Sequence, residues 1–344
     1  MTQQSSVRLG VLGAGTVGSA LIELIGARPE LGISLGKVLV RDLGKDRGPH
    51  VPKHLLTTDM DAVLDSADVV VELIGGVERA TEAIVRSLEA GKKVVTANKA
   101  VLAERWGGLE PYLAAGQLYF EAAVMAGTPV IGPLTGALRG SRPLELHAIL
   151  NGTCNYILSQ LEQGTSYDDA LAEAQQLGYA EADPTLDVEG FDAAHKLTVL
   201  ARLAFDPNTV WDDVKARTVG ISALTPAHVK EAMEDGGRVR LVGSVYPADG
   251  AWRAEVRPVY LPPAHPLAGS ASSRNGMVFR GDAVGEVFIS GAGAGANPTA
   301  SAVLADIIAA LAGRPGPSPL TEAAPLPTDY LSADYKVEVL GTVL

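Results

Sequence analysis

The chain has 344 residues, of which 47% are hydrophobic and 20% charged, a composition typical of folded proteins and a length that suits two domains. The formal net charge of -12 argues against general binding to nucleic acid or to anionic membrane surfaces. The single cysteine, Cys154, excludes an internal disulfide framework and a zinc site built from several cysteines. No signal peptide is visible at the start and no apolar stretch reaches about 18 residues, so we expect a soluble, cytoplasmic protein.

The first predicted elements are a strand over residues 7–12, a glycine-rich turn and an amphipathic helix over residues 19–25. Gly13 allows the tight turn, Gly15 lets the backbone approach a pyrophosphate, and Gly18 lets helix and strand pack closely. N–H groups at the start of the helix would bind the phosphates. This context favours a dinucleotide site over a glycine turn without a ligand. The predicted contacts are Gly13, Ala14, Gly15, Thr16, Val17 and Gly18.

The second predicted strand, residues 36–40, ends in a basic cluster. Arg41 follows it directly, and Lys45 and Arg47 come shortly after. Folds that bind NAD usually place a carboxylate here for the ribose 2′-hydroxyl, whereas a 2′-phosphate requires basic groups. We therefore predict that Arg41 gives a weak preference for NADP(H). The adjacent Asp42 leaves NAD(H) open, and an ordinary polar loop would also explain Lys45 and Arg47.

Strands and helices continue to alternate up to residue 122. Strands are predicted over 69–74, 93–96 and 118–122, and a helix over 78–90. This order predicts an α/β fold, a doubly wound parallel sheet of the Rossmann type with helices on both faces. Ligands of such sheets bind beyond the carboxyl ends of the strands. The residues expected there include Arg41, Gly75, Asn98, Lys99 and the loop 121–128.

A strand over residues 144–150 and a helix over residues 154–163 are predicted next. We expect Thr153 to cap that helix, and Gly152 and Thr153 to offer N–H groups to a carboxylate. Nothing nearby arranges a base for a cysteine nucleophile. Cys154 is therefore predicted to be structural. His147 inside the strand, and His195, which should point to a different helix face from Lys196, are also predicted to be structural.

An acidic loop over residues 178–190 leads into a helix predicted over residues 191–205. Asp192 and Lys196 lie four residues apart on that helix and share a face. A loop of carboxylates beside a lysine suits the binding of an amino group next to a proton donor. The alternative is a solvated acidic loop with an ion pair worth only ~0.3–0.5 kcal/mol.

Long strands follow, predicted over 239–246, 252–261 and 278–289, and they indicate the sheet of an α+β substrate domain. A second glycine-rich turn, residues 291–295, precedes a helix predicted over residues 299–311. That turn is either a flexible loop or a close approach to the cofactor, with Gly295 as the contact. We place the dinucleotide-binding domain at 1–130, completed by residues 299–344, and the substrate-binding, catalytic and dimerisation domain at 131–298.

Seven segments, in this order, resemble homoserine dehydrogenases: GAGTVG, VELIGG, TANKA, FEAAVMAGTPVI, LNGTCNYIL, GYAEADPTLDVEGFDAAHKL and GAGAGANPTASAV. The match covers about residues 7–311. The resemblance implies NAD(P)H-dependent reduction of L-aspartate 4-semialdehyde to L-homoserine, and the reverse, in threonine, methionine and isoleucine biosynthesis.

The resemblance also implies roles for single residues. Lys196 matches the family's proton donor, and Lys99 matches a second lysine near nicotinamide and substrate. Glu181 and Asp192 would hold the substrate through its ammonium group, with Asp187 in a supporting role. Gly178 is carried over as a cofactor contact.

Members of the family bind a monovalent cation, usually sodium, after the FEAAV strand. Carried over, the ligands would be the Glu121 carboxylate and the main-chain carbonyls of Val124, Ala126 and Thr128, because hard oxygen ligands suit such an ion. This chain has Met125-Ala126 where an alanine or glycine pair is common. A homodimer is also implied, and we expect this chain to lack the C-terminal regulatory domain of many members.

Two other interpretations remain open at this stage. An amino-acid dehydrogenase that acts on aspartate would share the GAGTVG motif but need not contain the EADPTLDVEGFDAAHK segment. A non-catalytic sensor would bind NADPH without turnover, and Lys99 and Lys196 would be dispensable.

Overall fold

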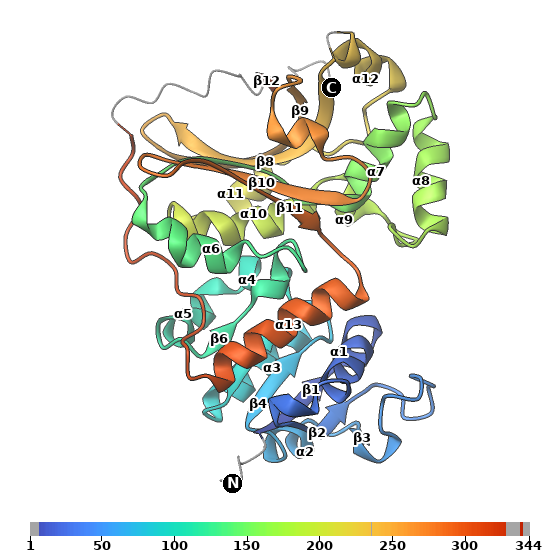
Figure 1. The fold of residues 1–344 in the computed structure, drawn as a ribbon, viewed down its shortest axis with the longest axis vertical. Coiled ribbons are helices and arrows are strands. Elements are labelled where there is room, and N and C mark those ends of the chain that lie inside the picture. Colours follow the sequence, from blue (N-terminus) through green and yellow to red (C-terminus); the bar gives the residue numbers. More distant parts are fainter. Residues whose placement is uncertain (1–6, 235, 328–337, 340–344) are drawn as a thin grey trace. The chain divides into compact units, whose positions relative to one another are not determined.

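The computed structural model describes residues 7–234, 236–327 and 338–339. They divide into two compact units (Figure 1). Unit 1 contains residues up to Gly132 and the segment Ala294–Pro319, and unit 2 contains Pro133–Gly293 and the residues from Leu320 onward. Each unit has its own sheet.

Unit 1 is built on a six-stranded sheet in the order β3-β2-β1-β4-β5-β6, and every pair of neighbours is parallel. The strands are β1 (Val7–Leu12), β2 (Ile33–Leu39), β3 (Leu56–Thr57), β4 (Val69–Glu72), β5 (Lys93–Thr96) and β6 (Leu118–Tyr119). The helices are α1 (Thr16–Gly26), α2 (Met60–Asp65), α3 (Glu78–Glu89), α4 (Lys99–Glu104), α5 (Trp106–Ala114) and α13 (Ala296–Leu311). This strand order is that of the Rossmann fold, so the predicted fold class is confirmed.

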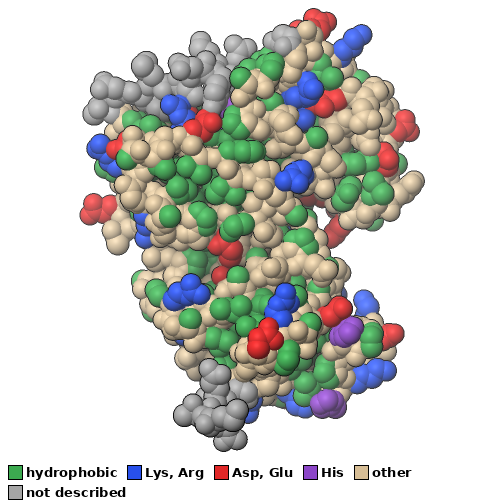
Figure 2. All heavy atoms as spheres, viewed as in Figure 1, with side chains coloured by type: hydrophobic (Ala, Val, Ile, Leu, Met, Phe, Trp, Pro, Cys, Tyr) green, Lys and Arg blue, Asp and Glu red, His purple; other side chains and the backbone are tan. Residues whose placement is uncertain are grey.

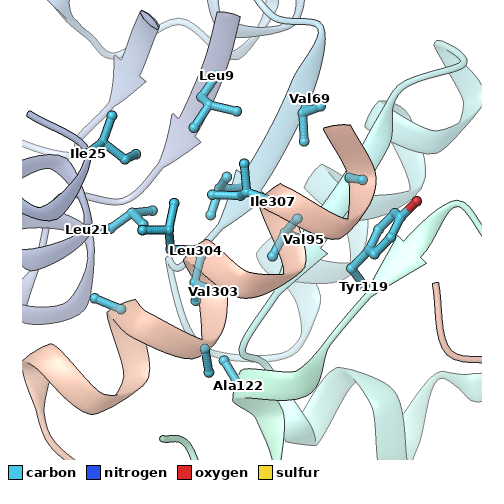
Figure 3. Packing of buried hydrophobic residues seen from close by; sticks show 14 of the residues in the cluster. Leu9, Leu21, Ile25, Val69, Val95, Tyr119, Ala122, Val303, Leu304 and Ile307 are labelled. Carbon is cyan, nitrogen blue, oxygen red and sulfur yellow. The ribbon is translucent and has the colours of Figure 1, made fainter. Parts of the chain in front are cut away.

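Helices cover both faces of this sheet. Leu9 of β1 belongs to a buried cluster that α1 and α13 complete with Leu21 and Leu304 (Figure 3). The next residue, Gly10, points to the opposite face, where a Cβ would lie 2.7 Å from Val63 of α2. The apolar strands are therefore buried on both sides, as parallel sheets require.

The strand predicted over residues 118–122 is shorter in the structure. β6 ends at Tyr119, and Phe120 has φ -157° and ψ 30°, which is outside the strand region. A 3₁₀ turn, Glu121–Ala123, follows. The chain therefore leaves the sheet one residue before Glu121.

Unit 2 contains a six-stranded sheet in the order β11-β10-β7-β8-β9-β12, and its neighbours are antiparallel. The strands are β7 (Pro143–Ile149), β8 (Arg238–Ala248), β9 (Ala251–Leu261), β10 (Arg274–Gly281), β11 (Gly285–Ala292) and β12 (Glu338–Val339). The helices are α7 (Gly152–Leu161), α8 (Tyr167–Gln176), α9 (Thr185–Val188), α10 (Phe191–Ala204), α11 (Trp211–Ala216) and α12 (Pro226–Met233); α6 (Ile131–Thr135) spans the boundary between the units.

The single strand predicted over residues 278–289 is wrong, because this segment contributes to the hairpin of β10 and β11. The Ser141 hydroxyl oxygen accepts the N–H groups of Ala283 and Val284 at the reversal. Gly285 has φ +73°, a conformation that favours glycine. A partner 142 residues away in the chain thus stabilises the turn, and the local pattern did not reveal it.

Helix α10 is buried along nearly its whole length, from Asp192 to Ala204. It packs on the sheet through Leu197, which would lie 3.2 Å from a Cβ at Gly243 of β8. A helix buried all round must satisfy its polar side chains internally. Asp192 and Lys196 do so with each other and with the end of β7.

The predicted return of residues 299–344 to the first domain differs from the structure in one part. Residues 320–327 pack within unit 2, where the Ala324 N–H donates to the Phe205 carbonyl at 2.7 Å. The Trp252 indole N–H donates to the Ala324 carbonyl at 2.8 Å. Residues 299–319 belong to unit 1. Residues 328–337 and 340–344 lie outside the described residues.

The described part of the chain contains no helix long and apolar enough to cross a membrane. On the face drawn in Figure 2, acidic and basic side chains are interspersed, and the described residues form no continuous basic stripe there.

Candidate active site

The glycine-rich turn after β1 has the geometry of a phosphate-binding turn. Gly13 has φ +107°, and a Cβ there would lie 2.6 Å from the Leu73 carbonyl oxygen. A Cβ at Gly18 would lie 2.0 Å from the Gly13 carbonyl oxygen, so α1 approaches the turn closely. At Gly15, by contrast, a Cβ would meet no other described residue within 4 Å beyond its immediate neighbours. The turn is therefore crowded at Gly13 and Gly18 but open at Gly15.

In the loop after β2 an arginine is exposed and a carboxylate is engaged in a local turn. Asp42 Oδ1 accepts the Gly44 N–H at 2.7 Å. The Arg47 guanidinium donates to the carbonyls of Asp42 and Lys45, at 2.7 and 2.8 Å. The Arg41 side chain is exposed. Arg41 and Lys45 are thus exposed basic residues of this loop, while Arg47 stabilises the loop.

The end of β4 carries a buried carboxyl group, Glu72. The Thr96 hydroxyl donates to Glu72 Oε2 at 2.6 Å, and the Ile74 N–H donates to Oε1 at 2.8 Å. Burial raises the pKa of Glu72, although these two hydrogen bonds lower it in part. The group joins the ends of β4 and β5, beside the residues expected to contact the cofactor.

Asn98 fixes the turn after β5. Its Nδ2 donates to the Gly76 carbonyl at 2.7 Å, and its Oδ1 accepts the Val101 N–H at 3.1 Å as the cap of α4. Gly75 and Gly76, in the turn after β4, have φ of +71° and +74°. Lys99 is the first residue of α4 and is half-buried.

Lys196 lies in a buried hydrogen-bonded cluster. Its Nζ donates to Asp192 Oδ2 and to the Leu150 carbonyl oxygen, both at 2.7 Å. The i,i+4 pair predicted from the sequence is confirmed, and both side chains are only 11% exposed, so this is not a solvated surface pair. The Leu150 carbonyl belongs to the residue after β7, 46 positions away in the chain. The ammonium group is therefore held by two independent elements.

Asn151 is the residue of this cluster that sequence reasoning missed. Its Nδ2 donates to Asp187 Oδ1 at 2.7 Å and to Asp192 Oδ2 at 2.8 Å. Its Oδ1 accepts the Cys154 N–H at 2.7 Å, so Asn151, and not Thr153 as expected, caps α7. The cap fixes the amide and directs Nδ2 at both carboxylates. Asparagine before a helix is a frequent cap, which was the available signal.

The first turn of α7 is close to the start of the acidic loop. The Thr153 hydroxyl donates to the Tyr179 carbonyl at 2.7 Å. A Cβ at Gly152 would lie 2.7 Å from the Ser273 carbonyl oxygen, so only glycine fits there. Both residues are thus fixed at a helix start, where N–H groups favour an anion.

The hydrogen-bonded cluster of Lys196, Asp192, Asn151 and Asp187 includes part of the acidic loop but not all of it. Asp187 and Asp192 belong to it, whereas the Glu181 side chain is exposed. The Glu181 carbonyl accepts from Gln175 Nε2 at 3.1 Å. Gly178 is exposed with φ +75°.

Three side chains predicted to be structural are packed in the interior. Cys154 is fully buried, its Sγ donates to the Asp187 carbonyl, and burial followed by the Asp187 and Asp192 charges raises the pKa of its thiol. His147 Nδ1 lies 2.9 Å from Ser244 Oγ. His195 stacks on Trp211 with ring centroids 4.1 Å apart.

The Glu121 carboxylate, expected to bind a cation, accepts several backbone N–H groups. Oε1 accepts from Val130 and Ile131 at 2.8 and 2.9 Å, and Oε2 accepts from Gly132 at 2.7 Å. The Glu121 N–H donates to Asp306 Oδ2 at 2.8 Å. Burial and the nearby Glu121 charge raise the pKa of Asp306 to about 8. Asp306 therefore tends to hold its proton at neutral pH, beside the Glu121 carboxylate at the start of this loop.

The backbone between Glu121 and Thr128 is strained. Met125 and Ala126 have φ of +56° and +42°, which costs an L-residue about 1–2 kcal/mol each. The Thr128 N–H donates to the Met125 carbonyl at 2.9 Å and closes the turn. Such strain clusters at ligand sites. The departure from the family pattern at Met125-Ala126 thus falls where glycine would be favoured.

Family models cover most of both parts of the chain. Residues 13–118 match the NAD-binding domain of homoserine dehydrogenase, and residues 129–308 match homoserine dehydrogenase itself. The chain belongs to the homoserine dehydrogenase family. The resemblance stated from the sequence motifs is confirmed, and the aspartate-type dehydrogenase and the sensor are not favoured.

Relatives and solved structures of homoserine dehydrogenases agree with this assignment. The homoserine dehydrogenase of Mycobacterium leprae is 43% identical over 330 residues, which cover 91% of this chain and 74% of that protein. A crystal structure of the Thiobacillus denitrificans homoserine dehydrogenase is 41% identical with a TM-score of 0.81, covering 88% of this chain and 72% of that one. A hyperthermophilic archaeal homoserine dehydrogenase solved in complex with NADPH is 28% identical with a TM-score of 0.74. The match covers 90% of this chain and 99% of that one.

Proposed function

We infer that this chain is an NAD(P)-dependent oxidoreductase that interconverts L-aspartate 4-semialdehyde and L-homoserine, the reaction of its family. The observation that carries the residue assignment is the buried ammonium group of Lys196, held at 2.7 Å from Asp192 and from the Leu150 carbonyl. This ammonium group can supply the proton that aldehyde reduction needs, and the glycine turn of unit 1 suits the dinucleotide that would supply the hydride.

The chemistry divides between cofactor and protein. The bound nicotinamide supplies a hydride to the aldehyde carbon. The carbonyl oxygen then carries a negative charge, and we assign Lys196 as the group that donates a proton to it, which gives the alcohol. In the reverse direction neutral Lys196 accepts the hydroxyl proton. Asp192 orients the lysine and balances its charge, and Asn151 holds Asp192.

We propose the remaining site residues from their places in the two units. Gly152 and Thr153 at the start of α7 suit the substrate carboxylate. Glu181, from the exposed part of the acidic loop, and Asp192 are proposed to bind the substrate ammonium, with Asp187 in a supporting role. Lys99 is proposed as the second lysine near nicotinamide.

The cofactor contacts are proposed on unit 1 and on the two later glycine turns. The turn from Gly13 to Gly18 would hold the pyrophosphate, and Gly75 and Asn98 would border the nicotinamide side. Gly178 and Gly295 are proposed as further contacts; Gly295 has φ +117° at the start of α13.

We propose a preference for NADP(H) because Arg41 is exposed at the end of β2 while Asp42 is turned onto Gly44. Arg41→Ala should then raise the KM for NADPH about tenfold and leave the KM for NADH within twofold, since one charged hydrogen bond is worth about 1.5–3 kcal/mol. Steady-state kinetics with both cofactors checks this. Lys45→Ala is the matched control, and equal effects on NADPH and NADH would remove Arg41 from the 2′-phosphate site.

A sodium ion is proposed at Glu121 and the carbonyls of Val124, Ala126 and Thr128. A carboxylate offers about four acceptor positions, and three N–H groups occupy three of them, so the donor set fits one cation. Melting temperatures in sodium and in tetramethylammonium chloride at equal ionic strength test the site; equal values would argue against it.

A homodimer is proposed through the sheet of unit 2. The edge strand β11 leaves Phe288 43% exposed, and Val284 at its turn is 45% exposed. A second copy would cover this apolar edge. Light scattering on the purified chain gives the molar mass, and a monomer at micromolar concentration would contradict the proposal. The cytoplasmic location stays a prediction.

The first experiment is NADPH oxidation with L-aspartate 4-semialdehyde, compared between the wild type and Lys196→Ala. Turnover that is lost in the variant, with NADPH binding retained, supports the assignment. Wild-type binding of NADPH without turnover would contradict the proposed function.

A further inference from the structure

Asn275 is a buried residue next to the Lys196 cluster that has no role in the proposed reaction. It lies on β10 and is 0% exposed. Its Nδ2 donates to the Leu150 carbonyl oxygen at 3.0 Å, the oxygen that also accepts from Lys196 Nζ at 2.7 Å. Both nitrogens are therefore neighbours across one carbonyl oxygen.

The sheet explains why a side chain does this. The ladder between β7 and β10 ends at the pair Gly276 and Ile149, so Leu150 lies beyond the last paired residue. Asn275 is the next residue on the other strand. Its amide continues the pairing where the backbone ladder stops, and it fixes the direction of the Leu150 carbonyl.

The amide is also held from one side by Gly293. A Cβ on Gly293 would lie 2.0 Å from Asn275 Cγ, 2.2 Å from Oδ1 and 2.3 Å from Nδ2. The glycine backbone therefore packs against the amide, and any larger residue would displace it. Gly293 is the last residue of unit 2 before the chain enters unit 1 at Ala294.

A purely structural role does not explain the amide well. Asn275 Oδ1 is buried and has no hydrogen-bond donor among the described residues. A buried acceptor without a partner is unfavourable, so an apolar residue would fill the space at lower cost. Turning the amide over would set Oδ1 against the Leu150 carbonyl, so the orientation is determined. What the asparagine provides is the single N–H bond to Leu150.

We propose that Asn275 is a positioning residue for Lys196 that acts through the Leu150 carbonyl, with Gly293 holding its amide in place. The proposal rests on the proposed function, in which Lys196 is the proton donor. Asn275 does not touch the substrate. It keeps the carbonyl in the place where it directs the ammonium group toward the reacting oxygen.

The test uses the purified full chain and two variants, Asn275→Asp and Asn275→Ala. Asn275→Asp keeps the shape, removes the donor and adds a carboxylate beside the ammonium group. It should lower kcat for aldehyde reduction about tenfold and leave the substrate KM within about threefold. Because a nearby carboxylate favours charged lysine, the basic limb of the kcat profile should move up by about one pH unit.

Asn275→Ala fits the space without a charge, so it keeps the proposal testable if the carboxylate prevents folding. It should lower kcat about tenfold with the affinity for NADPH, measured by fluorescence, unchanged. The matched control is Asn155→Asp. Asn155 is also buried and donates to the carbonyls of Ser270 and Arg274 instead of Leu150. It should lower the melting temperature but leave the pH profile of kcat in place.

The outcomes separate the two levels of inference. A wild-type pH profile and kcat in both Asn275 variants, while Lys196→Ala is inactive, would overturn the positioning role alone. An equal shift in Asn155→Asp would assign the effect to general loss of packing and overturn it too. Full turnover in Lys196→Ala would instead contradict the proposed function.

Discussion

Glu72 in unit 1 and Asp192 in unit 2 are both buried carboxyl groups, but they differ in their hydrogen-bond donors. Asp192 accepts from the Lys196 ammonium and the Asn151 amide. Glu72 accepts from neutral donors, among them the Thr96 hydroxyl and the Ile74 N–H, and burial raises its pKa. A buried carboxylate beside an ammonium keeps a charged proton donor in place, whereas one among neutral donors tends to take up a proton and becomes a structural link.

The largest expected effect comes from removing the ammonium group. Lys196→Met should reduce kcat by about 10²–10⁴-fold, the usual contribution of a positioned acid or base. NADPH affinity should remain, and fluorescence titration measures it. Lys215→Met on α11 removes an exposed lysine of the same unit and serves as the control. A variant that lost NADPH affinity while keeping kcat would show that Lys196 is no proton donor.

Removing the Asp192 carboxylate tests the same ion pair with Lys196. Asp192→Asn leaves a buried ammonium without its counter-charge and should destabilise the fold by about 3 kcal/mol, measured by urea denaturation. In the double variant with Lys196→Met the loss should be smaller than the sum of the two single losses, because neither charge is then left alone. Additive losses would mean that the two side chains are not coupled.

Glu72→Gln addresses the carboxyl group without a cationic partner. Because the pKa of Glu72 is raised in the folded state, the folded chain holds a proton that the unfolded chain releases above pH 4.5. The stability that it contributes is complete below pH 4.5 and is lost as the pH rises through the folded pKa. Relative to the wild type, Glu72→Gln should therefore become more stable as the pH increases from 4.5. Melting temperatures across that range check this, and a constant difference would contradict the protonated link.

The smallest effect is expected from the donor to that carboxyl group. Thr96→Val removes the 2.6 Å hydrogen bond to Glu72 with little change of volume and should cost about 1 kcal/mol. It should also steepen the loss of stability with rising pH, since this bond lowers the pKa of Glu72. Thr198→Val in unit 2, whose hydroxyl donates to the Ala194 carbonyl within α10, provides the control. Equal pH dependence in wild type and Thr96→Val would show that the bond does not control the protonation of Glu72.

Local patterns predicted those features that involve residues a few positions apart. The glycine turn from Gly13 to Gly18 depends on spacing within one turn, and its strand and helix were both recognisable. The pair Asp192 and Lys196 follows from the 3.6-residue period of a helix. The alternating strands of unit 1 are apolar because both faces of a parallel sheet are covered. For each, the sequence alone was sufficient.

Only the tertiary structure decided which distant groups complete the site. Asn151 reaches Asp187 and Asp192 across 36 and 41 residues, and Asn275 meets the Leu150 carbonyl across 125. These contacts depend on where β7, β10 and α10 lie in unit 2, and no local period carries that information. A lysine's role as a held proton donor is set by such partners, so the sequence determined the lysine and the fold determined its surroundings.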